Sequence, residues 1–151
     1  MACGYFWRHS LLMSFISSQA DQANAMCPRT LVEHIGIRFH VDDKGRFCGT
    51  MPVDERTHQA AGLLHGGATA VLAESLGSMG SALLTDLATC TVVGIEVHVN
   101  HLKGVRSGTV VATGELVHTG RTMHVWDIRV HNDAGELCAV CRLTNLIIER
   151  K

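Results

Sequence analysis

Strand-like runs of hydrophobic and polar residues occur six times along the chain, and turn sequences that contain glycine separate several of them. The first two runs flank Asp42-Asp-Lys-Gly45, which predicts a β-hairpin. Asn132-Asp-Ala-Gly135 predicts the turn before the last strand. The six runs are residues 35–41, 46–53, 91–102, 108–118, 122–132 and 136–148.

One helical run, residues 66–85, separates the second strand from the third. It is apolar nearly all round, which is expected only if a sheet curls about it or a second subunit covers its other side. Each of its glycines lowers helix stability by about 1 kcal/mol relative to alanine, so close backbone packing must compensate. The element order shows no βαβ alternation and predicts an α+β fold, in which an antiparallel six-stranded sheet is wrapped around one long central helix.

The rest of the sequence adds an arm and no second domain. The length of 151 residues suits a single domain, residues 1–151. Residues 1–30 are expected to form an N-terminal arm or short helix, because residues 8–26 contain an amphipathic stretch. No run approaches the roughly 20 apolar residues of a membrane span, and the start lacks a convincing signal-peptide cleavage site. We therefore expect a cytoplasmic protein that does not bind membranes.

Charge and cysteine usage narrow the function further. The formal net charge is -1 and the sequence pI is about 6.8, so no basic surplus indicates nucleic-acid binding. Six cysteines scattered through apolar segments are typical of free thiols in a reducing compartment. Cys138 and Cys141 have metal-like spacing, but strand positions three apart point to opposite faces. We expect no metal site.

Glu74 is the one charged residue in the helical run of residues 66–85. An unpaired ionised carboxylate loses several kcal/mol of solvation when it is buried, so a lone acid in such surroundings usually serves chemistry. The alternative is a helix with one edge in solvent. The sequence favours Glu74 as a catalytic residue.

The start of the same helix can supply the other half of an active site. Its first backbone N–H groups and the positive end of its dipole attract developing negative charge, and Gly66 and Gly67 let a substrate come close. A carbonyl group held at Gly66 becomes more electrophilic, while Glu74 can attack it or activate a water. These parts suffice to hydrolyse an activated acyl group.

Three polar residues can assist this pair, and each has a structural alternative. Gln59 can donate its amide to the oxyanion or belong to an ordinary loop. His65 can act in catalysis or bond to a backbone carbonyl at the helix start. Ser78 lies one turn from Glu74 on the same helix face and can orient water or substrate, or bond back to its own helix.

The spacing of the two halves predicts a dimer. Eight helical residues place the Gly66 end and the Glu74 backbone about 12 Å apart along the axis, which is far for one carbonyl. If two helices pack antiparallel across a two-fold axis, the start of one can approach the carboxylate of the other. We therefore expect two equal active sites shared between subunits, although a bent helix in a monomer is also conceivable.

Three segments together carry a family resemblance: Met51-Pro-Val-Asp-Glu-Arg-Thr-His-Gln59, Gly62-Leu-Leu-His-Gly-Gly-Ala68 and Leu72-Ala-Glu-Ser-Leu-Gly-Ser78. The chain resembles the hotdog-fold acyl-CoA thioesterases of the phenylacetate-degradation type. Within them it is similar to 1,4-dihydroxy-2-naphthoyl-CoA hydrolases and to enterobactin proofreading thioesterases. The similarity runs from about Trp7 to the final strand.

The resemblance implies a metal-free and cofactor-free hydrolase of acyl thioesters, with coenzyme A as part of the substrate. It also implies a homodimer that commonly pairs into a homotetramer. It places the catalytic carboxylate on Glu74, the carbonyl-polarising amide on Gly66 and the helix hydroxyl on Ser78, and it makes Gln59 and His65 assisting residues. Contacts to the CoA nucleotide fall near His101, Lys103, Arg121 and Thr122.

One departure from the family pattern bears on the substrate. Relatives typically have Pro-Phe after the motif glutamine, whereas this chain has Ala60 and Ala61. Loss of an aromatic side chain removes apolar contact area, so we expect a wider acyl pocket and a weaker preference for flat aryl groups. The acyl group and the choice between CoA and carrier-protein thioesters stay open.

Two other functions are compatible with a hotdog scaffold. A hydratase or dehydratase would use a histidine and an acid to move a proton next to the thioester, but His65-Gly-Gly differs from the patterns typical of those enzymes. A non-catalytic acyl-CoA sensor would carry a DNA-binding helix-turn-helix, and the first 30 residues are too short and not basic enough for one.

Overall fold

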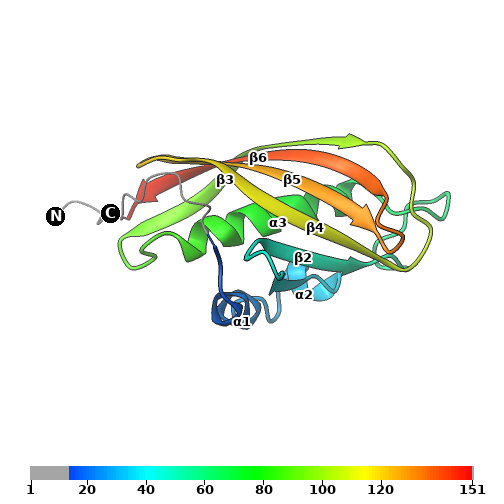
Figure 1. Ribbon diagram of the computed structural model, residues 1–151, viewed down its shortest axis with the longest axis horizontal. Coiled ribbons are helices and arrows are strands. Elements are labelled where there is room, and N and C mark those ends of the chain that lie inside the picture. Colours follow the sequence, from blue (N-terminus) through cyan, green and yellow to red (C-terminus); the bar gives the residue numbers. More distant parts are fainter. Residues whose placement is uncertain (1–13, 151) are drawn as a thin grey trace.

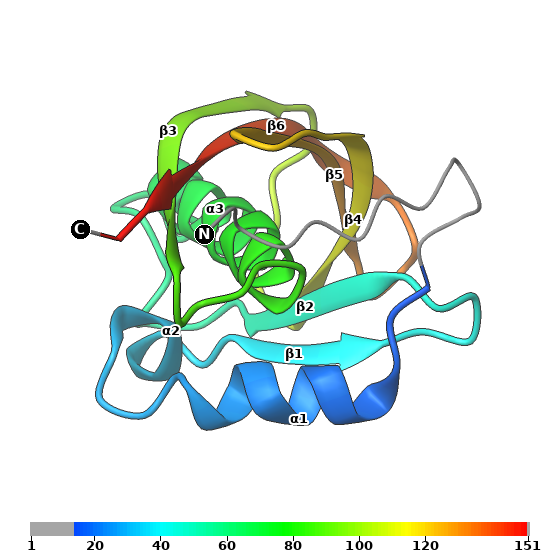
Figure 2. The ribbon, with the colours of Figure 1, turned by 90° about the vertical axis from the view of Figure 1, so that its left-hand side faces the viewer.

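The computed structural model describes residues 14–150 and contains one curled sheet around one long helix. The sheet has six strands in the order β1-β2-β4-β5-β6-β3, and every neighbouring pair is antiparallel. Figure 2 shows α3 lying inside the curl, with α1 beside the edge strand β1. The elements are α1 (Ser17–Ala25), α2 (Leu31–His34), β1 (Arg38–Val41), β2 (Phe47–Pro52), α3 (Gly66–Leu83), β3 (Cys90–His101), β4 (Thr109–Thr119), β5 (Met123–Asn132) and β6 (Leu137–Glu149).

The predicted fold class is confirmed, and the strand boundaries agree to within a few residues. Both predicted turns occur, with Gly45 at φ 74° and Gly135 at φ 75°, a region that favours glycine. The first strand starts later than expected, at Arg38, because Gly36 adopts φ 75° directly after the short helix α2. The sequence analysis did not predict α2.

The N-terminal arm is helical in the part that the structure describes. α1 lies beside β1 and buries Ala20 and Ala23, while Phe15 packs on Phe47 with ring centroids 5.1 Å apart. Residues 1–13 lie outside the described residues. No helix of residues 14–150 is long and apolar enough to cross a bilayer.

The five cysteines of residues 14–150 are all free and buried. Burial raises the pKa of the Cys141 thiol to about 11, so this thiol stays protonated at neutral pH. In the same part of the chain no group of three or more histidine, cysteine, aspartate or glutamate side chains is placed to hold a metal ion.

The glycines of α3 let the helix pack closely against Trp126. A Cβ atom at Gly80 would lie 2.7 Å from the Trp126 ring, and one at Gly77 would lie 2.5 Å from Leu143. Trp126 and Leu143 are fully buried, so neither can move aside freely. The close packing predicted for the glycines of this helix is therefore a contact between α3 and the inner face of the sheet.

Gly80→Ala should consequently destabilise the protein, although alanine is the better helix former. We expect a net loss of up to about 2 kcal/mol in the free energy of unfolding, because overpacking costs about 1–3 kcal/mol and helix propensity offsets roughly 1 kcal/mol of it. Urea denaturation of both proteins measures the difference. A variant as stable as the wild type would show that the helix can shift away from Trp126.

His124 is buried in β5 with 3% of its surface exposed, and its Nδ1 has no hydrogen-bond partner among residues 14–150. Burial, and to a smaller extent the neighbouring His118, lower the pKa of His124 below its usual value. The unfolded chain therefore binds a proton on this histidine more readily than the folded chain does. The contribution of neutral His124 to stability is therefore full above the unfolded pKa of about 6.5 and is lost as the pH falls through the lower folded pKa.

Lowering the pH from about 7.5 to 5.5 should therefore decrease Tm, and His124→Gln should weaken that dependence. Differential scanning calorimetry of the two proteins at both pH values measures the change in Tm. An equal change in Tm for the variant and the wild type would assign the acid sensitivity to other groups.

Candidate active site

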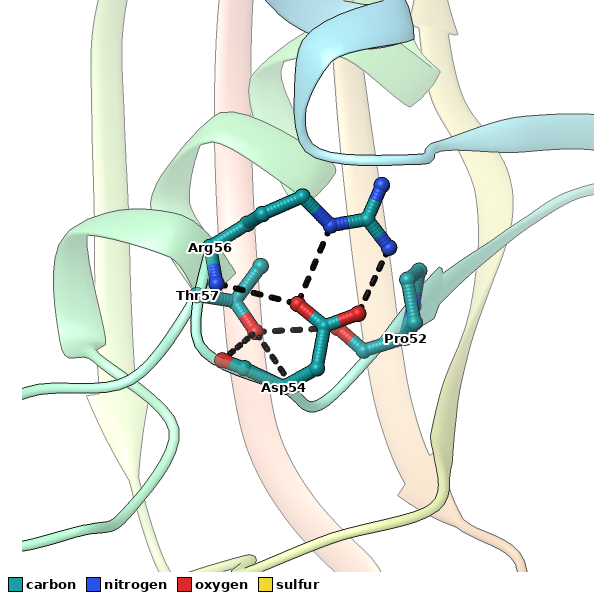
Figure 3. Close-up of polar contacts among 4 residues, drawn as sticks. All are labelled: Pro52, Asp54, Arg56 and Thr57. Carbon is teal, nitrogen blue, oxygen red and sulfur yellow. Dashed lines mark hydrogen bonds and ion pairs between the residues drawn. The ribbon is translucent and has the colours of Figure 1, made fainter.

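A short loop after β2 fixes the position of the helix start (Figure 3). The buried Thr57 hydroxyl donates to the Pro52 carbonyl at 3.0 Å and accepts from the Asp54 N–H at 3.1 Å. The Asp54 carboxylate accepts from the backbone and guanidinium of Arg56, and these bonds lower the pKa of Asp54. The Thr57 carbonyl accepts from the His65 N–H at 2.8 Å, which ties this loop to the start of α3.

His65 is the N-cap residue of α3. Its Nδ1 accepts a hydrogen bond from the Gly67 N–H at 2.8 Å, so the imidazole satisfies one of the unpaired donors of the helix start. The Gly66 N–H has no acceptor among residues 14–150. The Gly66 amide, which is the one predicted to polarise a carbonyl, is therefore available to a ligand, whereas the Gly67 amide is not.

A cavity of about 310 Å³ opens beside this amide. Gln59 lines it, with its Oε1 accepting from the Ala61 N–H at 2.6 Å, so its amide nitrogen remains the donor of the side chain. His101 also lines it and lies directly over Gly66, where a Cβ atom would be 2.9 Å from the imidazole Nε2. Gln59, Gly66 and His101 therefore meet at one end of α3.

The residues predicted to contact CoA fall into two groups rather than one. His101 and Lys103 lie at the cavity beside Gly66, and Lys103 is paired with Glu136. Arg121 and Thr122 lie at the β4–β5 turn, beside a different cavity at the start of β3 and the end of β6. The two groups are far apart in one chain, because the β4–β5 turn and the end of β3 occupy opposite ends of the sheet.

Glu74 is exposed in the single chain, so the expectation that its carboxylate is withdrawn from solvent is wrong for a monomer. The carboxylate lies against the edge strand β3, where a Cβ atom at Gly94 would be 3.0 Å from its Oε1. The pairing of β3 with β6 shifts register between Gly94 and Glu96, which marks a bulge at this place. Any side chain at Gly94 would crowd Glu74.

Ser78 does not bond back to its own helix. Its hydroxyl donates to Oδ1 of Asn145 at 3.2 Å, and Asn145 is fully buried on β6. Asn145 was not predicted as a site residue. The signal for it in the sequence was a single amide side chain in the largely apolar run Leu143-Thr-Asn-Leu-Ile-Ile148.

One chain therefore holds two half-sites at different places along α3. Gly66, Gln59 and His101 surround the helix start, whereas Glu74, Ser78 and Asn145 meet at Gly94 on β3. Gly66 and Glu74 are eight residues apart, or about 12 Å along the axis. A carbonyl at the Gly66 N–H is out of reach of Glu74 in the same chain.

The chain belongs to the thioesterase superfamily, whose family model matches residues 61–139. It is a hydrolase with the hotdog fold of that superfamily. It is 39% identical over 142 residues to the proofreading thioesterase EntH of Klebsiella pneumoniae, covering 94% of this chain and 98% of that one. The crystal structure of a Pseudomonas aeruginosa thioesterase, a glutamine-to-alanine variant, superposes with a TM-score of 0.85 and 45% identity, over 93% of this chain and 100% of that one.

A thioesterase of Staphylococcus aureus is represented by two variant crystal structures. A glutamate is replaced by alanine in one (TM-score 0.76, 37% identity, 80% of this chain and 99% of that one). A glutamine is replaced by alanine in the other (TM-score 0.74, 36% identity, 78% and 98%). The two replaced positions are fifteen residues apart in that protein, the same separation as between Gln59 and Glu74 here.

Proposed function

We propose that this thioesterase hydrolyses acyl-CoA thioesters to the free acid and CoA, at sites that each combine Gly66 of one subunit with Glu74 of its partner. The observation that carries the proposal is the pair of half-sites on α3. One offers an unpaired amide beside a cavity, and the other offers an exposed carboxylate on an edge strand. The matching separation of the replaced glutamine and glutamate in the Staphylococcus aureus thioesterase supports Gln59, beside Gly66, and Glu74 as residues of the active site.

β3 is the surface through which we propose that two chains associate. It ends the strand order, so no strand of residues 14–150 pairs with its outer edge over its 12 residues. Two large apolar side chains, Val93 and Ile95, are 39% and 52% exposed on it. A long apolar edge strand is a template for pairing with another strand, and a second copy of β3 in antiparallel orientation would continue the sheet.

The neighbours of the two half-sites fix where the two-fold axis must pass. Glu74 lies beside Gly94, and Gly66 lies beside His101. An axis that brings Gly66 to Glu74 of the partner must pass midway between these places, near Val97 and His98 on β3. The same axis carries the Arg121–Thr122 turn of one subunit toward the His101–Lys103 end of the other, so the divided CoA residues would also meet.

A cross-linking experiment tests this register. Cysteines at directly opposed strand positions have Cα atoms about 4.5–5.5 Å apart, within the range of a disulfide. We expect Val97→Cys or His98→Cys to form a covalent dimer under mild oxidation, and Arg38→Cys, on an exposed position of the opposite edge strand β1, to remain monomeric on a non-reducing gel. A cross-link for Arg38→Cys alone would place the interface elsewhere.

The chemistry follows from the two halves. The Gly66 N–H, with the positive end of α3 behind it and the Gln59 amide nearby, stabilises negative charge on the thioester oxygen. Glu74 of the partner then takes a proton from a water that attacks the carbonyl carbon, or it attacks this carbon itself. In both routes the C–S bond breaks, and the thiolate leaves with the electron pair and gains a proton from Glu74 or from solvent. In the second route the acyl group is left on Glu74 as an anhydride, which water hydrolyses to the free acid. His65 holds the helix start through the Gly67 N–H and thereby aims the Gly66 amide.

Apolar side chains on further strands support association beyond the dimer. Val117, Met123 and Ile148 are 54%, 37% and 45% exposed, and alternation with the buried His124 and Ile147 places the last two on the outer face of the sheet. We propose that two dimers pair through this face as a homotetramer.

The decisive assay is the release of free thiol from a panel of aryl, straight-chain and hydroxylated acyl-CoA esters and from acyl-carrier-protein thioesters. We expect release from CoA esters, with straight-chain groups accepted as well as aryl groups, because Ala60 and Ala61 next to Gln59 offer no aromatic side chain to hold a flat ring. Hydration of an enoyl thioester without thiol release would replace the proposal with a hydratase. Tight binding of acyl-CoA without turnover would replace it with a sensor.

A further inference from the structure

Asn145 connects the candidate catalytic face of α3 to the core through a fully bonded polar network. Its Nδ2 donates to the Gly77 carbonyl at 3.1 Å and to the Ser81 hydroxyl at 3.0 Å, and its Oδ1 accepts from Ser78 at 3.2 Å. Ser81 also accepts from the Trp126 indole N–H at 2.9 Å. Asn145, Ser81 and Trp126 are all fully buried, so water does not compete for these bonds.

The network determines which way the Ser78 hydroxyl points. A carbonyl oxygen can only accept, so the group of Asn145 that faces Gly77 must be its NH₂. The amide oxygen therefore faces Ser78, and because this oxygen also only accepts, the Ser78 hydroxyl must donate to it. The single proton of Ser78 is thus committed to Asn145, and only lone pairs of its oxygen remain for other partners.

Ser78 and Glu74 share one face of α3, one helical turn apart. A Cβ atom at Gly94 would lie 3.0 Å from Oε1 of Glu74 and 3.6 Å from Oδ1 of Asn145, the atom to which Ser78 donates. Glu74 and Asn145 therefore approach each other where β3 has no side chain, with Ser78 bonded to Asn145. The Ser78 oxygen and the Glu74 carboxylate are two acceptors with no donor between them. They suit a ligand with two O–H bonds on one oxygen, which is water.

We propose that Asn145 is a positioning residue that, by taking the Ser78 proton, makes Ser78 an acceptor for the hydrolytic water beside Glu74. The inference rests on the proposed function. The water donates one hydrogen to Ser78 Oγ and the other to Glu74, and one of its lone pairs faces the thioester carbon. As the new C–O bond forms, the second proton passes to Glu74. The C–S bond then breaks, the electron pair leaves on sulfur, and the thiolate takes the proton from Glu74.

A double-mutant cycle tests this role, because Asn145 is proposed to act through Ser78 alone. We expect Ser78→Ala and Asn145→Leu each to lower kcat about 10-fold, since misplacing a reacting group by about 1 Å can cost up to 100-fold. KM should stay within about two-fold, as expected when an interaction matters only in the transition state. The variant with both changes should be no slower than Ser78→Ala alone.

Three results would overturn the role of Asn145. They are independent losses that multiply to about 100-fold in the double variant, a wild-type kcat in Asn145→Leu, and an equal fall in kcat for Ile128→Val. The last is a control that loosens the core on the neighbouring strand without touching the network. If Asn145→Leu does not fold, Asn145→Ser removes the same acceptor and enters the same cycle.

The assays also separate this inference from the function beneath it. Failure of the wild type to release thiol, or full activity of Glu74→Ala, would refute the proposed function. Thiol release that depends on Glu74, together with a multiplicative cycle, would refute only the role of Asn145.

Discussion

Replacing Glu74 with alanine should lower kcat/KM for acyl-CoA hydrolysis by about 1000-fold, within the range of 10²–10⁴ typical for loss of a catalytic acid or base. The helical run contains no other charged residue that could substitute for it. The change should leave stability nearly unaltered, because Glu74 is exposed in the single chain and makes no salt bridge with any of residues 14–150. The lost activity would therefore reflect a defect in the catalytic step and not in folding.

Thiol release measured for Glu74→Ala, Glu74→Gln and a matched control tests this expectation. Glu74→Gln preserves the shape but not the charge, so it should be as inactive as the alanine variant. Glu115→Gln, which neutralises an exposed carboxylate on β4, should keep wild-type activity. Activity in Glu74→Gln comparable to the wild type would mean that the carboxylate charge is not needed.

Replacing Gly66 with proline should lower kcat by about 100- to 1000-fold, the cost of losing one oxyanion donor. Proline removes the N–H that we propose to polarise the carbonyl, and the first helical position is where proline is best tolerated. His65 already has φ -69° and ψ 132°, in the region favoured before proline. The helix start should thus keep its backbone path while losing one donor.

Gly66→Ala is the matched control, since it adds the same Cβ atom under His101 but keeps the N–H. His101 is an exposed side chain whose ring can move away from a contact of 2.9 Å. We expect Gly66→Ala to lose less than about 10-fold in kcat. Equal losses in both variants would show that crowding of His101, rather than loss of the amide, limits the reaction.

The fold could be predicted from the sequence because each element carries a local signal. The strands show strand-like patterning, the turns at Gly45 and Gly135 use residues that tolerate positive φ, and the glycines of α3 demanded close packing, which Trp126 provides. α2 was missed because four residues carry too little periodicity to distinguish a helical turn from a loop. Gly36 shortened β1 through its backbone conformation, which the pattern of side chains does not reveal.

The candidate site was only partly predictable, for reasons that concern distance in sequence. Gly66, Glu74 and Ser78 lie on one helix, so spacing alone places them. Asn145 reaches the same place from a strand 67 residues after Ser78, and only the register of β6 against β3 brings it there. His101 likewise reaches Gly66 through the end of β3. The exposure of Glu74 differs from expectation because a pattern of apolar residues does not distinguish a surface that the fold covers from one that is free for a partner.

The central claim is that each active site takes its amide from one subunit and its carboxylate from the other. Differently tagged Glu74→Ala and Gly66→Pro chains, expressed together and purified through both tags, give mixed dimers that test it directly. Shared sites predict about half of the wild-type activity per dimer, because one of the two equal sites has both Gly66 and Glu74 intact. Sites contained within single chains predict mixed dimers as inactive as the two parent variants, and that result would contradict the account.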